Sequence, residues 1–164
     1  MRAKGRIGER GSPPSGRVIW GPSLQTWKGG GRVSDVLEGL EAVTVHVTDI
    51  QRARRFYSQV LGLKEVSYQE KASRAAFAIP GTHVQLTMHI QAEGEGGRPP
   101  GTVTGIVFSH PDPVAACAEI LRRGGSIVDP PMPFANPFAK GVRGTFADPD
   151  GNEFLLRHIE ALAK

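Results

Sequence analysis

The chain has 164 residues, of which 39% are hydrophobic and 22% charged, the size and composition of one soluble globular domain. Its single cysteine, Cys117, excludes an intramolecular disulfide framework and a cysteine-rich zinc site. No apolar run approaches the roughly 18 residues that cross a bilayer, so we expect a cytoplasmic protein with no membrane partner.

The positive charge is concentrated at the N-terminus. Residues 1–32 hold seven Lys and Arg and one Glu, whereas the rest of the chain holds 13 basic and 15 acidic side chains. The first segment is also rich in Gly and poor in aliphatic residues, so it cannot bury enough apolar surface to fold. We therefore expect a disordered basic leader, 1–35, ahead of a single domain, 36–164. We expect no nucleic-acid partner, because nothing in the domain itself supports one.

The domain begins with a predicted strand–helix unit. Residues 40–50 alternate as in a half-buried strand, with the valines on one face and His46 on the other. Asp49 is typical of a helix N-cap, and apolar residues at helical spacing predict a helix that Gly62 ends. Three further strands complete a first module, 40–91, and are expected at 63–68, 75–79 and 83–90, with a turn at 80–82.

The same order recurs after a Gly- and Pro-rich linker, 92–101. A strand, a helix capped by Asp112 and three more strands predict a second module, 102–159. Aligning Asp112 with Asp49 sets an offset of 63 residues, which also places Gly125 on Gly62 and indicates an internal duplication. The strands of this module are expected at 102–109, 126–128, 143–147 and 153–158, with a proline-rich loop at 129–144.

Two segments carry a family resemblance. VTDIQRARRFYSQVLGLKEV (47–66) and FADPDGNEFLL (146–156) resemble the vicinal oxygen chelate superfamily, which includes glyoxalase I, extradiol dioxygenases, fosfomycin resistance enzymes and bleomycin-binding proteins. The resemblance covers residues 40–159. It implies an α+β fold in which two βαβββ modules form a curled mixed sheet around a cavity, and it implies a homodimer. Whether the modules pair within a chain or across a dimer stays open.

The resemblance also implies a divalent metal, held by four side chains, that gathers two neighbouring substrate oxygens. The matching positions are Ala42, Gln85, Gly105 and Leu155. Three of these side chains cannot ligate a metal, and one amide oxygen does not hold a divalent cation. We therefore expect no cofactor, and the sequence leaves open whether the protein is an enzyme.

A divalent metal held by relocated ligands is the alternative. Because residues two apart on a strand share a face, polar side chains accompany those four positions; they are His46, His83, Glu153 and Arg157. Two imidazoles and a carboxylate can bind a metal, and they can equally form hydrogen bonds with a ligand. His89 lies at a strand end, where we expect solvent exposure.

In the family, the segment matching 129–144 borders the mouth of the cavity. Phe134 and Phe138 would then cover a ligand, with Lys140 or Arg143 near an anionic group. The two rings would equally well pack back onto the sheet or across a dimer interface.

The sequence thus predicts a metal-free small-molecule-binding protein of the glyoxalase/bleomycin-resistance type, which sequesters a drug or metabolite in a cavity. The expected ligand-binding residues are His46, His83, Gln85, Phe134, Phe138, Glu153 and Arg157. One alternative is a glyoxalase-like lyase or isomerase, or a dioxygenase-type enzyme, with relocated metal ligands. Another is a metal-free enzyme in which Glu153 or His46 moves a proton next to a carbonyl. A structural or regulatory dimer with a filled cavity is the third.

Overall fold

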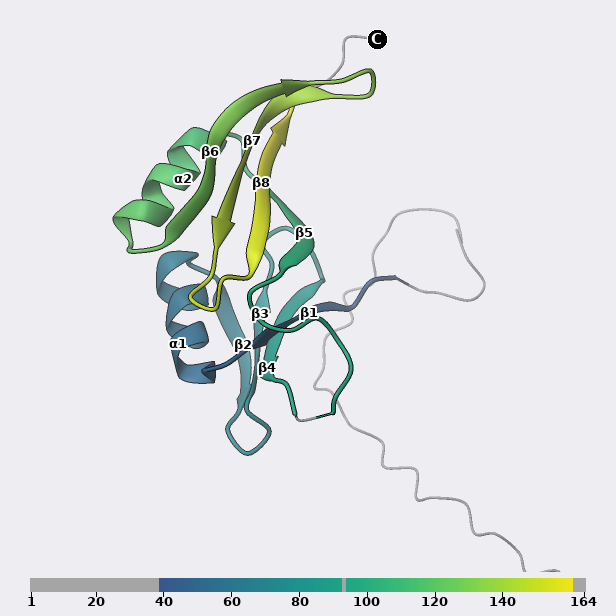
Figure 1. Ribbon diagram of the computed structural model, residues 1–164, viewed down its shortest axis with the longest axis vertical. Helices are drawn as coiled ribbons and strands as arrows, with labels where there is room; N and C mark the ends of the chain where they lie inside the picture. Colours follow the sequence, from purple (N-terminus) through teal and green to yellow (C-terminus); the bar gives the residue numbers. More distant parts are fainter. Residues whose placement is uncertain (1–38, 93, 161–164) are drawn as a thin grey trace, which may run out of the picture. The chain divides into compact units, whose positions relative to one another are not determined.

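The computed structural model describes residues 39–92 and 94–160, so the expected leader, 1–35, lies outside the described residues. The described chain forms two four-stranded mixed sheets, each accompanied by a helix (Figure 1). Within this part of the chain, no helix has the length and apolar character to span a membrane.

The first module forms a sheet with the strand order β1-β4-β3-β2. Strands β1 and β4 are parallel, and the other neighbours are antiparallel. The elements are β1 (Ala42–Val47), α1 (Ile50–Arg55), the π-helical turn η1 (Phe56–Val60), β2 (Lys64–Gln69), β3 (Arg74–Ala78) and β4 (Gln85–Ile90).

The second module repeats this plan with the order β5-β8-β7-β6, in which β5 and β8 are parallel. The α+β class and the two βαβββ modules expected from the sequence are thereby confirmed. The elements are β5 (Val103–Ser109), α2 (Pro113–Arg122), β6 (Ser126–Ala135), β7 (Lys140–Ala147) and β8 (Glu153–Ile159).

Aspartates begin both helices, as the sequence predicts. The Asp49 carboxylate accepts two backbone N–H groups of the first turn, each at 2.9 Å, and Asp112 accepts one at 3.0 Å. These bonds satisfy donors that have no partner inside the helix. Gly62 and Gly124 follow the helices with φ of 70° and 86°, the left-handed conformation that ends a helix at low steric cost.

The first helix ends in a wider turn than the sequence indicates. The N–H of Leu61 donates to the carbonyl of Phe56, five residues earlier, at 3.1 Å. This π-type turn brings the adjacent residues Phe56 and Tyr57 into the core together.

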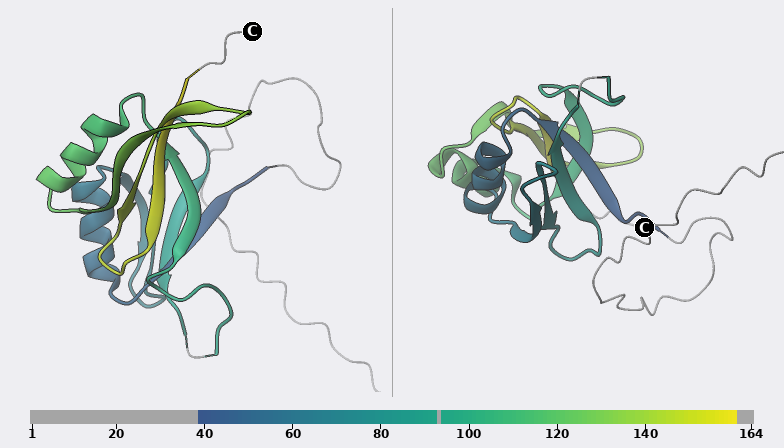
Figure 2. Two further views of the ribbon diagram at one scale, coloured as in Figure 1. Left: turned by 45° about the horizontal axis from the view of Figure 1, so that its top comes forward. Right: turned by 90° about the horizontal axis from the view of Figure 1, so that it is seen from below.

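The core lies between the helices and one face of each sheet. Buried side chains alternate along the strands, with Val45 and Val47 on β1 and Leu86 and Met88 on β4. The helices α1 and α2 lie side by side on the same side of the sheets (Figure 2). The intervening residues of each strand therefore face away from the helices, and this second face is the one left for a ligand.

The proline-rich segment 129–144 corrects the expectation of a loop. Strands β6 and β7 extend through it as a hairpin, with Met132 opposite Arg143. The strand expected to end at residue 128 therefore continues to Ala135. Proline is tolerated here because β6 is an edge strand, where a missing N–H removes no hydrogen bond from a further neighbour.

The turn between β7 and β8, residues 148–152, has the tight geometry that the sequence predicts. The Asp148 carboxylate accepts the backbone N–H groups of Asp150 and Asn152 at 2.9 and 3.0 Å. Gly151 has a φ of 81°, which a residue with a side chain rarely adopts.

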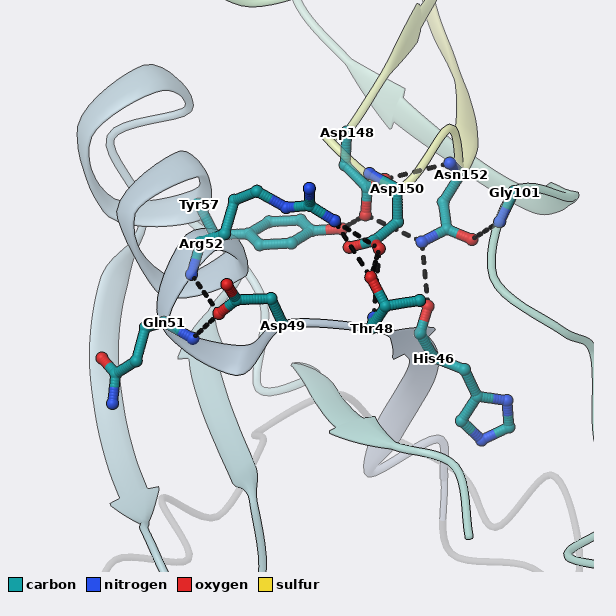
Figure 3. Close-up of polar contacts among 10 residues, drawn as sticks. All are labelled: His46, Thr48, Asp49, Gln51, Arg52, Tyr57, Gly101, Asp148, Asp150 and Asn152. Atoms are coloured by element: carbon teal, nitrogen blue, oxygen red, sulfur yellow. Dashed lines mark hydrogen bonds and ion pairs between the residues drawn. The ribbon is translucent and has the colours of Figure 1, made fainter. Parts of the chain in front are cut away.

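The same turn fastens the second module to the first, which the sequence does not reveal (Figure 3). The Asp150 side chain is only 2% exposed. Its carboxylate accepts the N–H of Thr48 at 3.0 Å and the Thr48 hydroxyl, and it lies 2.8 Å from the guanidinium of Arg52. The start of α1 is therefore tied to the β7–β8 turn by a buried, charge-assisted contact.

Two further contacts extend this attachment. The hydroxyl of Tyr57 donates to Asp148 at 2.8 Å, and the side-chain amide of Asn152 donates to the carbonyl of His46 at 3.0 Å. The Asn152 side-chain oxygen accepts the N–H of Gly101 at 3.0 Å. One turn thus holds the end of β1, the helix that follows it and the segment that leads into β5.

Replacing the buried carboxylate tests this attachment. In Asp150→Ala, the N–H of Thr48 and the guanidinium of Arg52 lose their shared acceptor. We expect the free energy of unfolding, measured in urea by circular dichroism, to fall by about 2 kcal/mol, because Arg52 is 43% exposed and regains water. Glu160→Ala, which breaks the exposed Lys140–Glu160 pair, should cost less than about 1 kcal/mol. Equal small losses would contradict a role in joining the modules.

The buried hydroxyl of Tyr57 leads to a second prediction, which concerns stability at high pH. Burial raises its pKa well above the ordinary value, and the Asp148 carboxylate raises it further. Because the folded-state pKa is raised, the stabilisation is complete below the unfolded pKa of about 10 and is lost as pH rises through the folded-state pKa. The chain has two tyrosines, so comparison with Tyr57→Phe isolates this hydroxyl in an absorbance titration. We expect its ionisation to appear only together with loss of the circular dichroism signal; ionisation in the folded protein would contradict the prediction.

Candidate functional site

The open face of the first sheet is polar where β1 and β4 run in parallel. Its side chains form three register pairs, which are Ala42 with Gln85, Thr44 with Thr87 and His46 with His89. The two threonine hydroxyls are 2.8 Å apart and hydrogen-bonded. His46 and Gln85, both predicted from the sequence as ligand contacts, therefore lie on one face but at opposite ends of the strand pair.

His46 forms a pair with His89. The ring centroids are 4.7 Å apart, nearly perpendicular to one another. The Nδ1 atom of His46 lies 2.7 Å from the carbonyl oxygen of Arg98, and since a carbonyl only accepts, this nitrogen carries a proton. The ring points away from the turn that binds the carbonyl of His46 (Figure 3).

His89 corrects the expectation of exposure at a strand end. It is only 9% exposed, and its Nε2 atom lies 3.2 Å from the carboxylate of Glu95. Within the described part of the chain, its Nδ1 atom is buried and has no hydrogen-bond partner. The N–H of Ala92 donates to Glu95 and lowers the pKa of that carboxyl, and His89 lowers it further.

The connecting segment after β4 is thus more than a linker. Gly97 packs so closely that a Cβ atom there would lie 2.5 Å from the His46 ring, and its φ of 136° is one that side chains rarely adopt. Arg98 binds His46 through its carbonyl and donates from its guanidinium to the carbonyl of Val103. The segment therefore covers the histidine pair.

The open face of the second sheet carries charged side chains beside apolar ones. Glu153, Leu155 and Arg157 share this face of β8, as predicted from their spacing. Leu155 lines a pocket of about 390 Å³. The other lining residues include Asp129, Met132, Arg143 and Thr145.

A larger hollow lies elsewhere. It has a volume of about 570 Å³, is more open to solvent, and borders Val47, Ile90 and Glu95 at the ends of β1 and β4. None of the residues predicted as ligand contacts lines either hollow. The smaller pocket is lined by Leu155, a position where the family resemblance implies a metal ligand, and by Arg143, expected near an anionic group, so we take it as the candidate site.

The two predicted phenylalanines lie in different surroundings. Phe134 is half-buried on β6, and the guanidinium of Arg143 lies 5.7 Å from its ring centroid. Phe138 is at the hairpin turn and is 86% exposed. Lys140, one of the two cations expected near an anionic group, instead pairs with Glu160 at 2.9 Å.

The candidates for a relocated metal site are not brought together. His83 is exposed in the turn before β4, and His46 lies beside the far end of that strand. The stretch of β4 from Gln85 to His89 alone spans about 13 Å, so His83 lies far from the histidine pair. Glu153 belongs to the other sheet. Among residues 39–92 and 94–160, no group of three or more His, Cys, Asp or Glu side chains is arranged to hold a metal ion.

The four positions implied by the family resemblance do not fit a metal either. Ala42 and Gln85 are direct neighbours on the sheet, as a shared ligand set requires. Gly105 lies where the β5–β8 register shifts, with a φ of 76°, and Leu155 lines the apolar pocket. One amide is the only donor among the four side chains, and no chemistry through a metal follows from it.

Sequence reasoning missed the His89–Glu95 contact, although part of the signal was present. Once Ala42 is placed opposite Gln85, a step of four residues along both parallel strands places His46 opposite His89. The position of Glu95 had no such signal, because a Gly-rich segment has no periodicity that orients its side chains.

Comparisons with known proteins agree with this architecture. The family model of the Glyoxalase/Bleomycin resistance protein/Dioxygenase superfamily matches residues 39–156, which confirms the resemblance seen in the sequence. Virulence protein STM3117 of Salmonella typhimurium is 27% identical over 119 residues, covering 71% of this chain and 81% of that protein.

Solved structures are similar as well. A superfamily member from Sphaerobacter thermophilus aligns with a TM-score of 0.62 and 27% identity, over 74% of this chain and 97% of that one. TnmS3, an antibiotic binding protein from Streptomyces sp. CB03234, aligns with a TM-score of 0.62 over 76% of this chain and 98% of its own. At 24% identity, the second likeness concerns the fold alone.

Because Gly97 packs closely over His46, we predict that adding one methyl group at Gly97 destabilises the protein. Gly97→Ala should displace the segment from His46, break the bond to the Arg98 carbonyl and lower the free energy of unfolding by about 1 to 3 kcal/mol. Faster amide exchange in residues 94–101 and a shifted His46 ring signal, measured by NMR, would report this change. Gly96→Ala is the matched control, since a Cβ there meets no atom within 4 Å. Similar spectra for the two variants would show that the segment does not rest on His46.

Proposed function

Because the chain belongs to the Glyoxalase/Bleomycin resistance protein/Dioxygenase superfamily, we propose that it is a metal-free member that sequesters a small molecule on the open face of its second sheet. The observation that carries the proposal is the pocket of about 390 Å³ at Leu155, a position where the family resemblance implies a metal ligand. An apolar side chain there serves ligand contact and not ligation.

The surface around the pocket supports a binding role. Val103 and Val107 lie opposite Glu153 and Leu155 on β5 and are 61% and 43% exposed, and Met132 on β6 is 54% exposed. Exposed apolar side chains gathered on one face are typical of a surface that a ligand or partner covers. The proposed assembly is a homodimer in which a second copy closes the pocket, with Phe138 available to reach it.

The enzyme alternatives have less support. His46 is on the first sheet, where it contacts the connecting segment and His89. Glu153 is on β8 of the second sheet, two residues before Leu155. No hydrogen bond joins His46 to Glu153 in the described residues. A proton-transfer enzyme would need an acid and a base that meet at one substrate atom.

Metal analysis and probe binding together test the proposal. Protein purified without a metal-affinity tag is assayed for metal as isolated and after incubation with zinc, nickel, manganese or iron(II). It is then titrated with the fluorescent apolar probe N-phenyl-1-naphthylamine. We expect no stoichiometric metal and one probe site, which Thr145→Phe weakens by about tenfold by filling the pocket. Val66→Phe, on an exposed position of the first sheet, is the bulk-matched control and should leave binding unchanged.

Two results would count against the proposal. One metal ion per chain, lost on Gln85→Ala or His46→Ala, would show that the protein does assemble a metal site. Probe binding that Thr145→Phe leaves intact would show that the pocket at Leu155 is not the binding site.

A further inference from the structure

We propose that the pocket at Leu155 selects ligands that carry an anionic group, held between Arg143 and Arg157, next to an apolar body that covers Met132 and Leu155. This inference rests on the proposed binding function and specifies its ligand class. The anionic group is a carboxylate, a sulfonate or a phosphate monoester.

The two arginines are direct neighbours on the open face. Arg143 on β7 is the register partner of Arg157 on β8. Side chains directly opposite on antiparallel strands have Cβ atoms about 5 Å apart, and like charges placed there repel. Since a guanidinium stays charged at any ordinary pH, the pair cannot relieve this repulsion by losing a proton.

Four other arginines of the described chain have acidic partners, and this pair does not. Arg52 pairs with Asp150 and Arg54 with Glu65, at 2.8 and 2.7 Å. Arg122 and Arg123 both pair with Glu119. In the same residue ranges neither Arg143 nor Arg157 forms an ion pair. Arg143 lines the pocket and Arg157 is its neighbour on β8, so two unneutralised positive charges lie side by side at one edge of the pocket.

Two acidic side chains belong to the same face without cancelling this charge. Asp129 lines the pocket and lies on β6, opposite Thr145, but it makes no ion pair with either arginine. Glu153 is four residues from Arg157 along β8, about 13 Å at strand spacing. The site facing the arginines thus keeps a positive potential, and an anion placed there would convert a repulsion into two attractions.

The rest of the pocket would contact the apolar body of the ligand. Met132 and Leu155 offer aliphatic surface, and Thr145 adds a hydroxyl beside them. The guanidinium of Arg143 lies over the ring of Phe134, and this cation–π contact favours one orientation of the arginine side chain. A planar guanidinium can donate two parallel hydrogen bonds to a carboxylate or a phosphate, which a lysine cannot reproduce.

Two fluorescent probes that differ by one sulfonate test this selectivity. We would titrate wild type with 8-anilinonaphthalene-1-sulfonate and with the uncharged N-phenyl-1-naphthylamine. The sulfonate probe should bind more tightly, and raising KCl from about 50 to 300 mM should weaken it while leaving the uncharged probe unchanged.

Substitutions then locate the charge. Arg143→Gln and Arg157→Gln should each weaken the sulfonate probe by about tenfold and change the uncharged probe less than about twofold. Unchanged binding of the uncharged probe shows that the variant is folded. Arg55→Gln, on the exposed side of α1, removes the same net charge elsewhere and should change neither probe.

Each other outcome has a defined meaning. If both probes bind equally, or if Arg55→Gln weakens the sulfonate probe as much as the pocket variants do, anion selection by this pair is wrong and the apolar binding function stands. If neither probe binds, or if Thr145→Phe affects neither, the proposed function and this inference both fail.

Discussion

The contact between the β7–β8 turn and the start of α1 holds the two modules in place. A carboxylate that is 2% exposed, Asp150, meets a guanidinium and a backbone N–H of the other module. Removing an ionised carboxylate from water costs free energy, which is offset only when its charged and hydrogen-bonding partners are present. The contact therefore specifies one arrangement of the two modules. Asn152 extends the same constraint to the carbonyl of His46 and to the segment that leads into β5.

This constraint is asymmetric although the modules are repeats. In the first module the turn between β3 and β4, residues 79–84, contains Gly81 and no acidic side chain, whereas its counterpart in the second module, residues 148–152, carries Asp148, Asp150 and Asn152. Among the described residues, the second turn is therefore the one of the two whose side chains form hydrogen bonds with the other module. The duplicated backbone provides two equivalent halves, and a few polar residues decide how one half meets the other.

The two open faces have diverged in chemistry for the same reason. Side chains on the far side of a sheet from its helix are free of core packing, so they can change without cost to the fold. On the first sheet this face carries the histidine pair and is covered by the segment around Gly97. On the second sheet it carries exposed valines, Leu155 and an unneutralised pair of arginines. The second face therefore has the character of a binding surface, whereas the first is covered at its histidine end.

Local patterns in the sequence determined the element types, the capping aspartates, the glycines that end the helices, and the face on which each strand residue lies, because these depend on spacing over a few residues. Proline count alone suggested a loop at 129–144, and only the position of β6 at a sheet edge made a strand there acceptable. The burial of His89, its contact with Glu95, the pairing of Arg143 with Arg157 and the attachment through Asp150 were decided by the tertiary structure. These contacts depend on strand register or on the packing of segments that are distant in the chain. Register and packing produce no periodic pattern in a single sequence, so the sequence alone could not predict them.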